Sequence, residues 1–108
     1  MQTGNLYSNS TAPATGERFD TLLTHRGLVI ERIVSSSKIE LQTCVQPQDE
    51  WVVLLEGEAL LNVNGQAVPL RSGDHVFLPA QTPHTVLSVS QGAMWLAVHL
   101  HAQPLGGV

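Results

Sequence analysis

Two segments decide how this chain folds. Residues 44–57 read CVQPQDEWVVLLEG, and residues 73–84 read GDHVFLPAQTPH. Residues 51–55 are apolar at every position, which predicts a strand that is covered on both faces. Glu50 precedes this strand, and His84 opens another strand after a proline-bounded turn. If both strands belong to one closed sheet, the carboxylate and the imidazole can face a common cavity.

Short β-rich segments separated by turn signals surround these two segments. We expect strands over residues 19–24, 27–35, 38–43, 51–55, 59–63, 66–70, 75–78, 84–89 and 94–101. The Asn64-Gly65 pair is a strong hairpin signal, because both residues tolerate positive φ. No stretch keeps a helical period with caps. The pattern predicts an all-β antiparallel sandwich or barrel.

The chain is organised as a single domain. Residues 1–16 are polar and aperiodic, which predicts a flexible N-terminal arm. The barrel is expected over residues 17–102, and residues 103–108 form a short tail rich in Pro and Gly. With 108 residues, the chain is long enough to bury one hydrophobic core.

Composition narrows the classes of function. The chain has 43% hydrophobic and 13% charged residues, and its formal net charge is -4. Only 5 residues are Lys or Arg, without a basic run, which argues against a nucleic-acid surface. The longest apolar run, residues 51–55, is far too short to span a membrane. The N-terminus lacks the features of a secretory signal, so we expect a cytoplasmic protein. The single cysteine excludes an intrachain disulfide.

The two segments resemble the two sequence motifs of the cupin superfamily. Glu50 and Gly57 have the spacing that ends the first motif. Gly73, Pro79 and His84 have the spacing of the second motif, and the gap between the motifs is short, as in small single-domain cupins. The resemblance covers roughly residues 27–101. It implies a double-stranded β-helix, or jelly-roll barrel, of the conserved cupin 2 type.

The resemblance also implies a metal site, of which half is altered. Cupins usually hold a divalent metal with two His and one Glu of the first motif and one His of the second. Glu50 and His84 keep these positions, whereas Cys44 and Gln46 stand where the two first-motif histidines would be. Gln81 also replaces a usual Gly. The first metal motif is therefore degenerate.

A third ligand would have to come from elsewhere. Imidazole and carboxylate suit Fe, Mn, Ni and Zn, and the remaining donors are the amide of Gln46, the thiolate of Cys44 and the imidazole of His99 or His101. A cysteine such as Cys44 is, however, more often a small buried hydrophobe than a ligand. The histidines of residues 94–101 share a face with Trp95, and the opposite face is apolar, so the sequence leaves open which face lines the barrel. The candidate metal ligands are Glu50, His84, Gln46, His99 and Cys44.

Three functions remain open. The first is a metal-dependent dioxygenase or isomerase acting on a small organic molecule. The second is a metal-free barrel that binds a small ligand through a few polar contacts. The third is a structural module, because the apolar strand at residues 51–55 and the low charge favour a sheet face covered by another subunit, most simply in a homodimer. Strand parity suggests a cavity lined by Val52, Leu54, Phe77, Val86, Leu96 and Val98.

Overall fold

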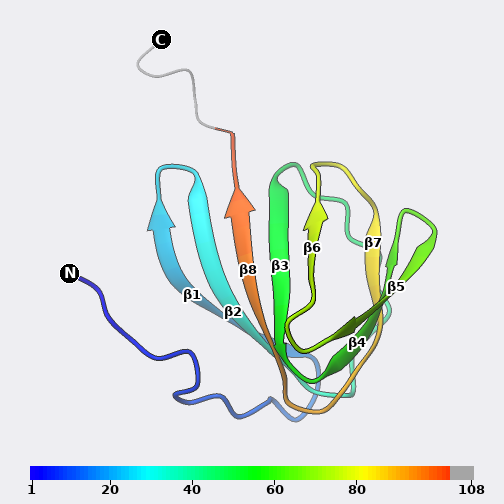
Figure 1. Ribbon diagram of the computed structural model, residues 1–108, viewed down its shortest axis with the longest axis horizontal. Helices are drawn as coiled ribbons and strands as arrows, with labels where there is room; N and C mark the ends of the chain where they lie inside the picture. Colours follow the sequence, from blue (N-terminus) through cyan, green and yellow to red (C-terminus); the bar gives the residue numbers. More distant parts are fainter. Residues whose placement is uncertain (103–108) are drawn as a thin grey trace.

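The computed structural model describes residues 1–102, which form eight strands and no helix (Figure 1). The strands are β1 (Glu17–His25), β2 (Leu28–Ser35), β3 (Asp49–Glu56), β4 (Glu58–Val63), β5 (Gln66–Arg71), β6 (His75–Leu78), β7 (His84–Val89) and β8 (Ala93–Leu100). No helix that could cross a membrane is found in this part of the chain. The predicted tail at residues 103–108 lies outside the described residues.

The strands form two antiparallel sheets. One has five strands in the order β1-β2-β8-β3-β6, and the other has three in the order β5-β4-β7. Strands far apart in sequence lie side by side, as β2 does with β8 and β4 with β7 (Figure 1). This arrangement confirms the predicted all-β jelly roll, because strands that return beside distant partners are characteristic of that fold.

The register of the five-stranded sheet decides which side chains point inward. Glu50 on β3 stands opposite His99 on β8, and Val52 stands opposite Ala97. Because side chains alternate along a strand, the face that carries Trp95, Ala97 and His99 points toward the smaller sheet. The apolar residues Leu96, Val98 and Leu100 therefore lie on the outer face, which settles the alternative that the sequence left open.

The hydrophobic core fills the space between the sheets. Its most deeply buried members include Leu54 and Ala97, both at 0% exposure, and it continues through Leu61 and Leu78. Trp95 closes one end of this core, and its indole nitrogen donates a 3.0 Å hydrogen bond to Ser35 Oγ. The indole N–H is thus satisfied inside the core, as a buried donor must be.

Two turns require residues that tolerate positive φ. Asn64 and Gly65 have φ of 51° and 87°, which confirms the predicted hairpin between β4 and β5. Gly57 has φ of 97° between β3 and β4, and a Cβ atom there would lie 2.5 Å from Ser90 Oγ. A side chain at position 57 would therefore clash as well as strain the backbone.

The predicted strand over residues 38–43 is wrong. This segment has no strand partner, and only the bridge between Cys44 and His84 connects the stretch that follows it to a sheet. Ile39 packs against the core while Lys38 and Glu40 are exposed. Leu41 is 69% exposed, so the alternation that predicted a strand corresponds neither to pairing with a neighbouring strand nor to a buried face.

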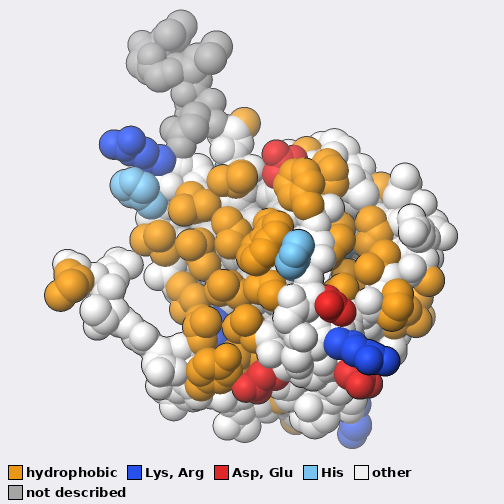
Figure 2. Space-filling view, in the orientation of Figure 1, with side chains coloured by type: hydrophobic (Ala, Val, Ile, Leu, Met, Phe, Trp, Pro, Cys, Tyr) orange, Lys and Arg blue, Asp and Glu red, His pale blue; other side chains and the backbone are white. Residues whose placement is uncertain are grey.

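The outer face of the five-stranded sheet carries an apolar row. Ile30, Val98, Trp51 and Phe77 stand opposite one another on β2, β8, β3 and β6. Trp51 is 37% exposed and Phe77 is 53% exposed. Figure 2 shows hydrophobic side chains gathered on this face. The expectation that Phe77, Leu96 and Val98 line the cavity is therefore wrong, because the strand parity places them outside.

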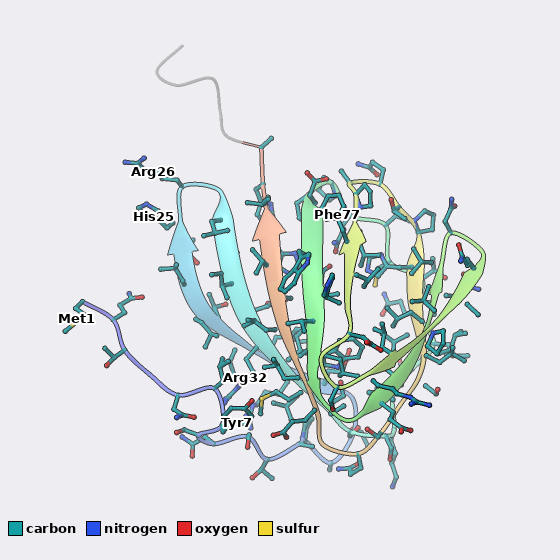
Figure 3. The ribbon with its side chains drawn as sticks, in the orientation of Figure 1. Met1, Tyr7, His25, Arg26, Arg32 and Phe77 are labelled. Atoms are coloured by element: carbon teal, nitrogen blue, oxygen red, sulfur yellow. The ribbon has the colours of Figure 1, made fainter. Side chains whose placement is uncertain are left out.

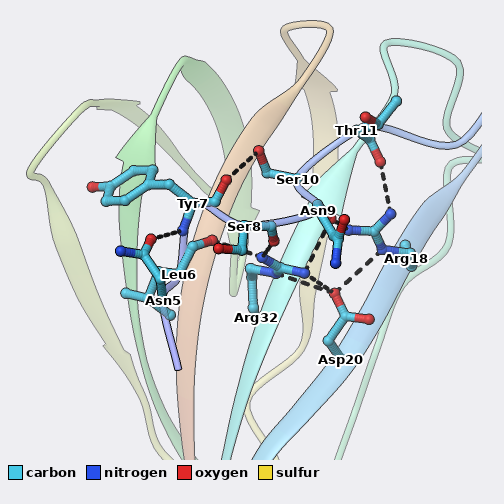
Figure 4. Close-up of polar contacts among 10 residues, drawn as sticks. All are labelled: Asn5, Leu6, Tyr7, Ser8, Asn9, Ser10, Thr11, Arg18, Asp20 and Arg32. Carbon is cyan, nitrogen blue, oxygen red and sulfur yellow. Dashed lines mark hydrogen bonds and ion pairs between the residues drawn. The ribbon is translucent and has the colours of Figure 1, made fainter. Parts of the chain in front are cut away.

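Arg32 ties the N-terminal arm to the end of the sheet (Figure 4). The guanidinium donates to the backbone oxygens of Leu6, Ser8 and Asn9 and to Asp20 Oδ2, at distances of 2.5 to 3.2 Å. Arg18 also contacts Asp20, and donates to the Asn9 oxygen. The hydrogen bond from Arg32 lowers the pKa of Asp20, although burial acts in the opposite direction. The predicted flexibility of residues 1–16 stays a prediction, but part of this arm is attached.

Candidate functional site

A cavity of about 470 Å³ lies between the two sheets. Its apolar wall comes from both sheets and includes Ile33, Val52, Leu61, Leu78, Val86 and Trp95. Of the residues expected to line it, Val52 and Val86 do so. The segment at residues 38–44 forms another part of the wall, to which Ile39, Gln42 and Cys44 contribute. The size is in the range of small-molecule pockets.

Glu50 is the buried carboxylate of this cavity. It lies at the start of β3, where the register turns it inward, and is 8% exposed. Gln46 donates a 2.7 Å hydrogen bond from Nε2 to Glu50 Oε1. No described residue donates to the second oxygen, Oε2. Because burying a charge without partners is costly, an unpaired oxygen beside a cavity is suited to a ligand.

His99 joins Glu50 to a second carboxylate. Its Nε2 lies 2.9 Å from Glu31 Oε1, its Nδ1 lies 3.1 Å from Gln48 Nε2, and the distance from Nδ1 to Glu50 Oε1 is 4.0 Å. A carboxylate oxygen only accepts, so Nε2 carries the proton and Nδ1 accepts from the Gln48 amide. Both nitrogens of His99 are therefore engaged with the protein.

His84 presents a free nitrogen to the cavity. Its Nδ1 lies 3.1 Å from the backbone oxygen of Thr82. The carbonyl can only accept, so Nδ1 carries a proton, and in the neutral ring Nε2 keeps its lone pair. The backbone of His84 is fixed by two hydrogen bonds to Cys44, of 2.8 and 3.0 Å. Directly opposed residues of such a pair project to the same side, and both line the cavity.

The five candidate residues from the sequence, Glu50, His84, Gln46, His99 and Cys44, all line the one cavity. Cys44 sits at its exposed rim, where its thiol lies 3.9 Å from the Gln42 backbone oxygen. His101 follows the end of β8 and is exposed, so it does not reach the interior.

Sequence reasoning missed Glu31 and Gln48. Strand parity contained a signal for Glu31, because it lies between Val29 and Ile33 on one face of the strand. A charge on a buried face calls for a partner, which His99 supplies. Nothing in the pattern around Gln48 indicated its contact, since that contact depends on how the loop before β3 folds over β8.

The side chains do not fit the metal centre that the resemblance implies. No three His, Cys, Asp or Glu side chains within residues 1–102 are placed so that they could hold a metal ion. Gln46 directs its amide nitrogen to Glu50, and His99 uses both nitrogens. Among the five candidate ligands, only Glu50 and His84 offer a free carboxylate or imidazole donor, whereas protein sites for such metals commonly use three or more protein ligands. The hypothesis that Fe, Mn, Ni or Zn binds here stays a prediction.

The fold and the cavity define a small single-domain jelly-roll protein. The family model described as Cupin domain matches residues 39–99, more than half of the chain. The chain therefore belongs to the cupin family, which confirms the resemblance of the two sequence motifs.

Solved structures agree with this assignment. A protein from Ralstonia eutropha JMP134, provisionally assigned as a mannose-6-phosphate isomerase, has 34% identity and a TM-score of 0.85, covering 94% of this chain and 100% of its own. An RmlC-like cupin from Desulfovibrio desulfuricans has 20% identity and a TM-score of 0.79, covering 93% of this chain and 96% of its own. A structure of Fe(II)-HppE with an alternative substrate has 18% identity and a TM-score of 0.68, covering 79% of this chain and 50% of its own. No curated protein matches the sequence.

Proposed function

We propose that this cupin binds a small organic molecule in the cavity between its sheets and does so without a resident metal ion. The observation that carries the proposal is the combination of an apolar chamber of about 470 Å³ with a buried carboxylate, Glu50, whose second oxygen has no protein donor. Gln46 and His84 supply further polar contacts. Such a chamber with a few polar groups is the usual form of a ligand pocket.

A second candidate is a metal-dependent dioxygenase or isomerase. It is favoured by the position of His84, whose Nε2 is left free by the hydrogen bond to Thr82, as in a histidine prepared for a metal. The related Ralstonia protein, provisionally an isomerase, supports the same class of reaction. If a metal bound here, it would act as a Lewis acid toward a substrate oxygen. Glu50 and His84 would hold it.

One experiment separates the two candidates. Protein purified without chelator is analysed for Fe, Mn, Ni and Zn, and its melting temperature is measured against a panel of small molecules with and without EDTA. The first proposal predicts substoichiometric metal and a ligand-dependent rise that survives EDTA. Stoichiometric metal, with ligand stabilisation that disappears in EDTA, would support the second candidate and contradict the first.

We also propose that the outer face of the five-stranded sheet pairs with a second copy of the chain. The row of Ile30, Val98, Trp51 and Phe77 crosses β2, β8, β3 and β6 without a charged residue. A two-fold axis through this row would place apolar side chains of one copy against apolar side chains of the other. A homodimer of this kind leaves the cavity on the opposite face of the sheet accessible.

A further inference from the structure

Three side chains that line the cavity offer hydrogen-bond acceptors to it. Glu50 Oε2 has no donor among the described residues, and His84 Nε2 is an acceptor in the neutral imidazole, whose Nδ1 donates to the Thr82 oxygen. Gln46 turns its NH₂ group to Glu50, which leaves its amide oxygen as a third acceptor. All three residues line the cavity.

The donors of the inner wall are already used within the protein. Trp95 donates its indole N–H to Ser35 Oγ, and His99 donates from Nε2 to Glu31. The N–H groups of Trp95 and His99 are therefore not available to a ligand, whereas the three acceptors are. A ligand that meets these acceptors must bring N–H or O–H groups of its own.

The charge of the lining points the same way. Glu17, Glu31, Glu40 and Glu50 line the cavity, whereas Lys38 is its one Lys or Arg side chain. Within residues 1–102, none of these carboxylates forms an ion pair with a Lys or Arg side chain. The potential inside the cavity is consequently negative, and this disfavours an anion such as a phosphate ester.

We infer that the ligand of this cavity is an organic cation, in which a protonated amine donates to Glu50, His84 and Gln46 and an apolar body packs on Val52, Leu61 and Trp95. This inference rests on the proposed function and adds the ligand's charge. A cationic ligand would differ in charge from the provisional substrate of the Ralstonia relative, which is a sugar phosphate. An ammonium brings three donors, which matches the three acceptors.

Ligands of nearly the same shape and different charge test the inference. Benzylamine, benzyl alcohol and benzoate, with mannose 6-phosphate as a further anion, are titrated into the full chain by calorimetry in EDTA, so that no metal supplies the positive charge. We expect benzylamine to bind about tenfold more tightly than benzyl alcohol, since a charge-assisted hydrogen bond contributes about one order of magnitude in affinity or more. The two anions should bind more weakly than the alcohol.

Two variants locate the preference. Glu50→Gln keeps the shape of the side chain and the contact with Gln46 but removes the charge, and should make benzylamine and benzyl alcohol bind equally. Glu56→Gln, at the exposed end of the same strand, is the matched control and should leave the tenfold preference intact. Should Glu50→Gln fail to fold, Gln46→Met removes the amide that donates to Glu50 Oε1 and should increase the preference for benzylamine over benzyl alcohol, because both carboxylate oxygens then lack a protein donor.

Each outcome decides something. Equal binding of amine and alcohol to the wild type, or tighter binding of either anion, would overturn the cationic ligand while leaving small-molecule binding in place. Failure of all four compounds to bind at millimolar concentration would count against both the inference and the proposed pocket function. A preference for the amine that persists in Glu50→Gln would contradict the assignment of Glu50.

Discussion

Replacing Arg32 with alanine removes the guanidinium that holds the N-terminal arm against the five-stranded sheet. Figure 3 shows Arg32 and Tyr7 at the same end of the sheet, while Met1 lies away from it. Arg32 is 7% exposed and makes five hydrogen bonds, three to backbone oxygens of the arm and two to Asp20. The variant therefore tests whether these contacts contribute to the free energy of unfolding.

The expected cost follows from what remains after the substitution. Hydrogen bonds to a charged group contribute about 1.5 to 3 kcal/mol each, but their contributions do not add. Asp20 keeps its contact with Arg18 and is one-third exposed, and the released backbone oxygens can bind water. We therefore expect the free energy of unfolding to fall by about 2 to 3 kcal/mol, below the range for breaking a fully buried ion pair.

Urea unfolding measures this change, and limited chymotrypsin cleavage after Tyr7 reports on the arm itself. Cleavage should become about tenfold faster in Arg32→Ala, because local opening of the arm no longer breaks the contacts to Leu6, Ser8 and Asn9. Arg71→Ala is the matched control, since it removes an exposed arginine and should change stability by less than about 0.5 kcal/mol. Equal stability and equal cleavage in Arg32→Ala and the wild type would refute this account of the arm.

Three further predictions concern other parts of the molecule. Asp20 has a lowered pKa in the folded chain, so its ionised form stabilises the fold above the unfolded pKa of about 4, and this contribution is lost as the pH falls through the lowered value. The difference in urea stability between wild type and Asp20→Asn should therefore shrink from pH 7 to pH 2.5. A difference that stays constant over this range would contradict the role given to Asp20. Phe77→Asp should convert a dimer to a monomer in light scattering at micromolar concentration, with the exposed Leu41→Asp as control, and a monomeric wild type would refute the proposed pairing. Gly57→Ala should lower the free energy of unfolding by at least about 1 kcal/mol, because the new Cβ meets Ser90, whereas Gly65→Ala, with open space at its Cβ, should cost less.

Much of the fold could be predicted because it depends on local signals. The Asn64-Gly65 turn and the alternation around it are readable without tertiary information. The segment at residues 38–43 could not be placed, because alternation of polar and apolar residues does not by itself show that a segment pairs with a strand. Whether a segment finds a hydrogen-bonding neighbour depends on which sheet edge lies within reach, and a single sequence does not contain that information.

The sequence indicated side chains that line the cavity, but it did not indicate all of their hydrogen-bond partners. Family spacing placed Glu50 and His84 beside one cavity, and the structure brings them to the same lining. The partners of His99, in contrast, come from β2 and from the loop before β3, at separations that no motif spans. Glu31 reaches His99 across 68 positions, and Gln48 reaches it across 51. Such contacts follow from sheet register, which sequence spacing alone does not fix.

The substitution of Cys and Gln for two histidines changes what the remaining carboxylate can do. In a cupin metal site, histidine nitrogens and the Glu oxygen converge on one cation. Here the NH₂ group of Gln46 donates to one oxygen of Glu50, and no described residue donates to the other oxygen. A buried negative charge still requires compensation, and a single neutral amide provides only part of it. Glu50, which would bind the cation in a cupin metal site, therefore still requires a positively charged partner. A protonated amine can be that partner without the histidines that a metal would need.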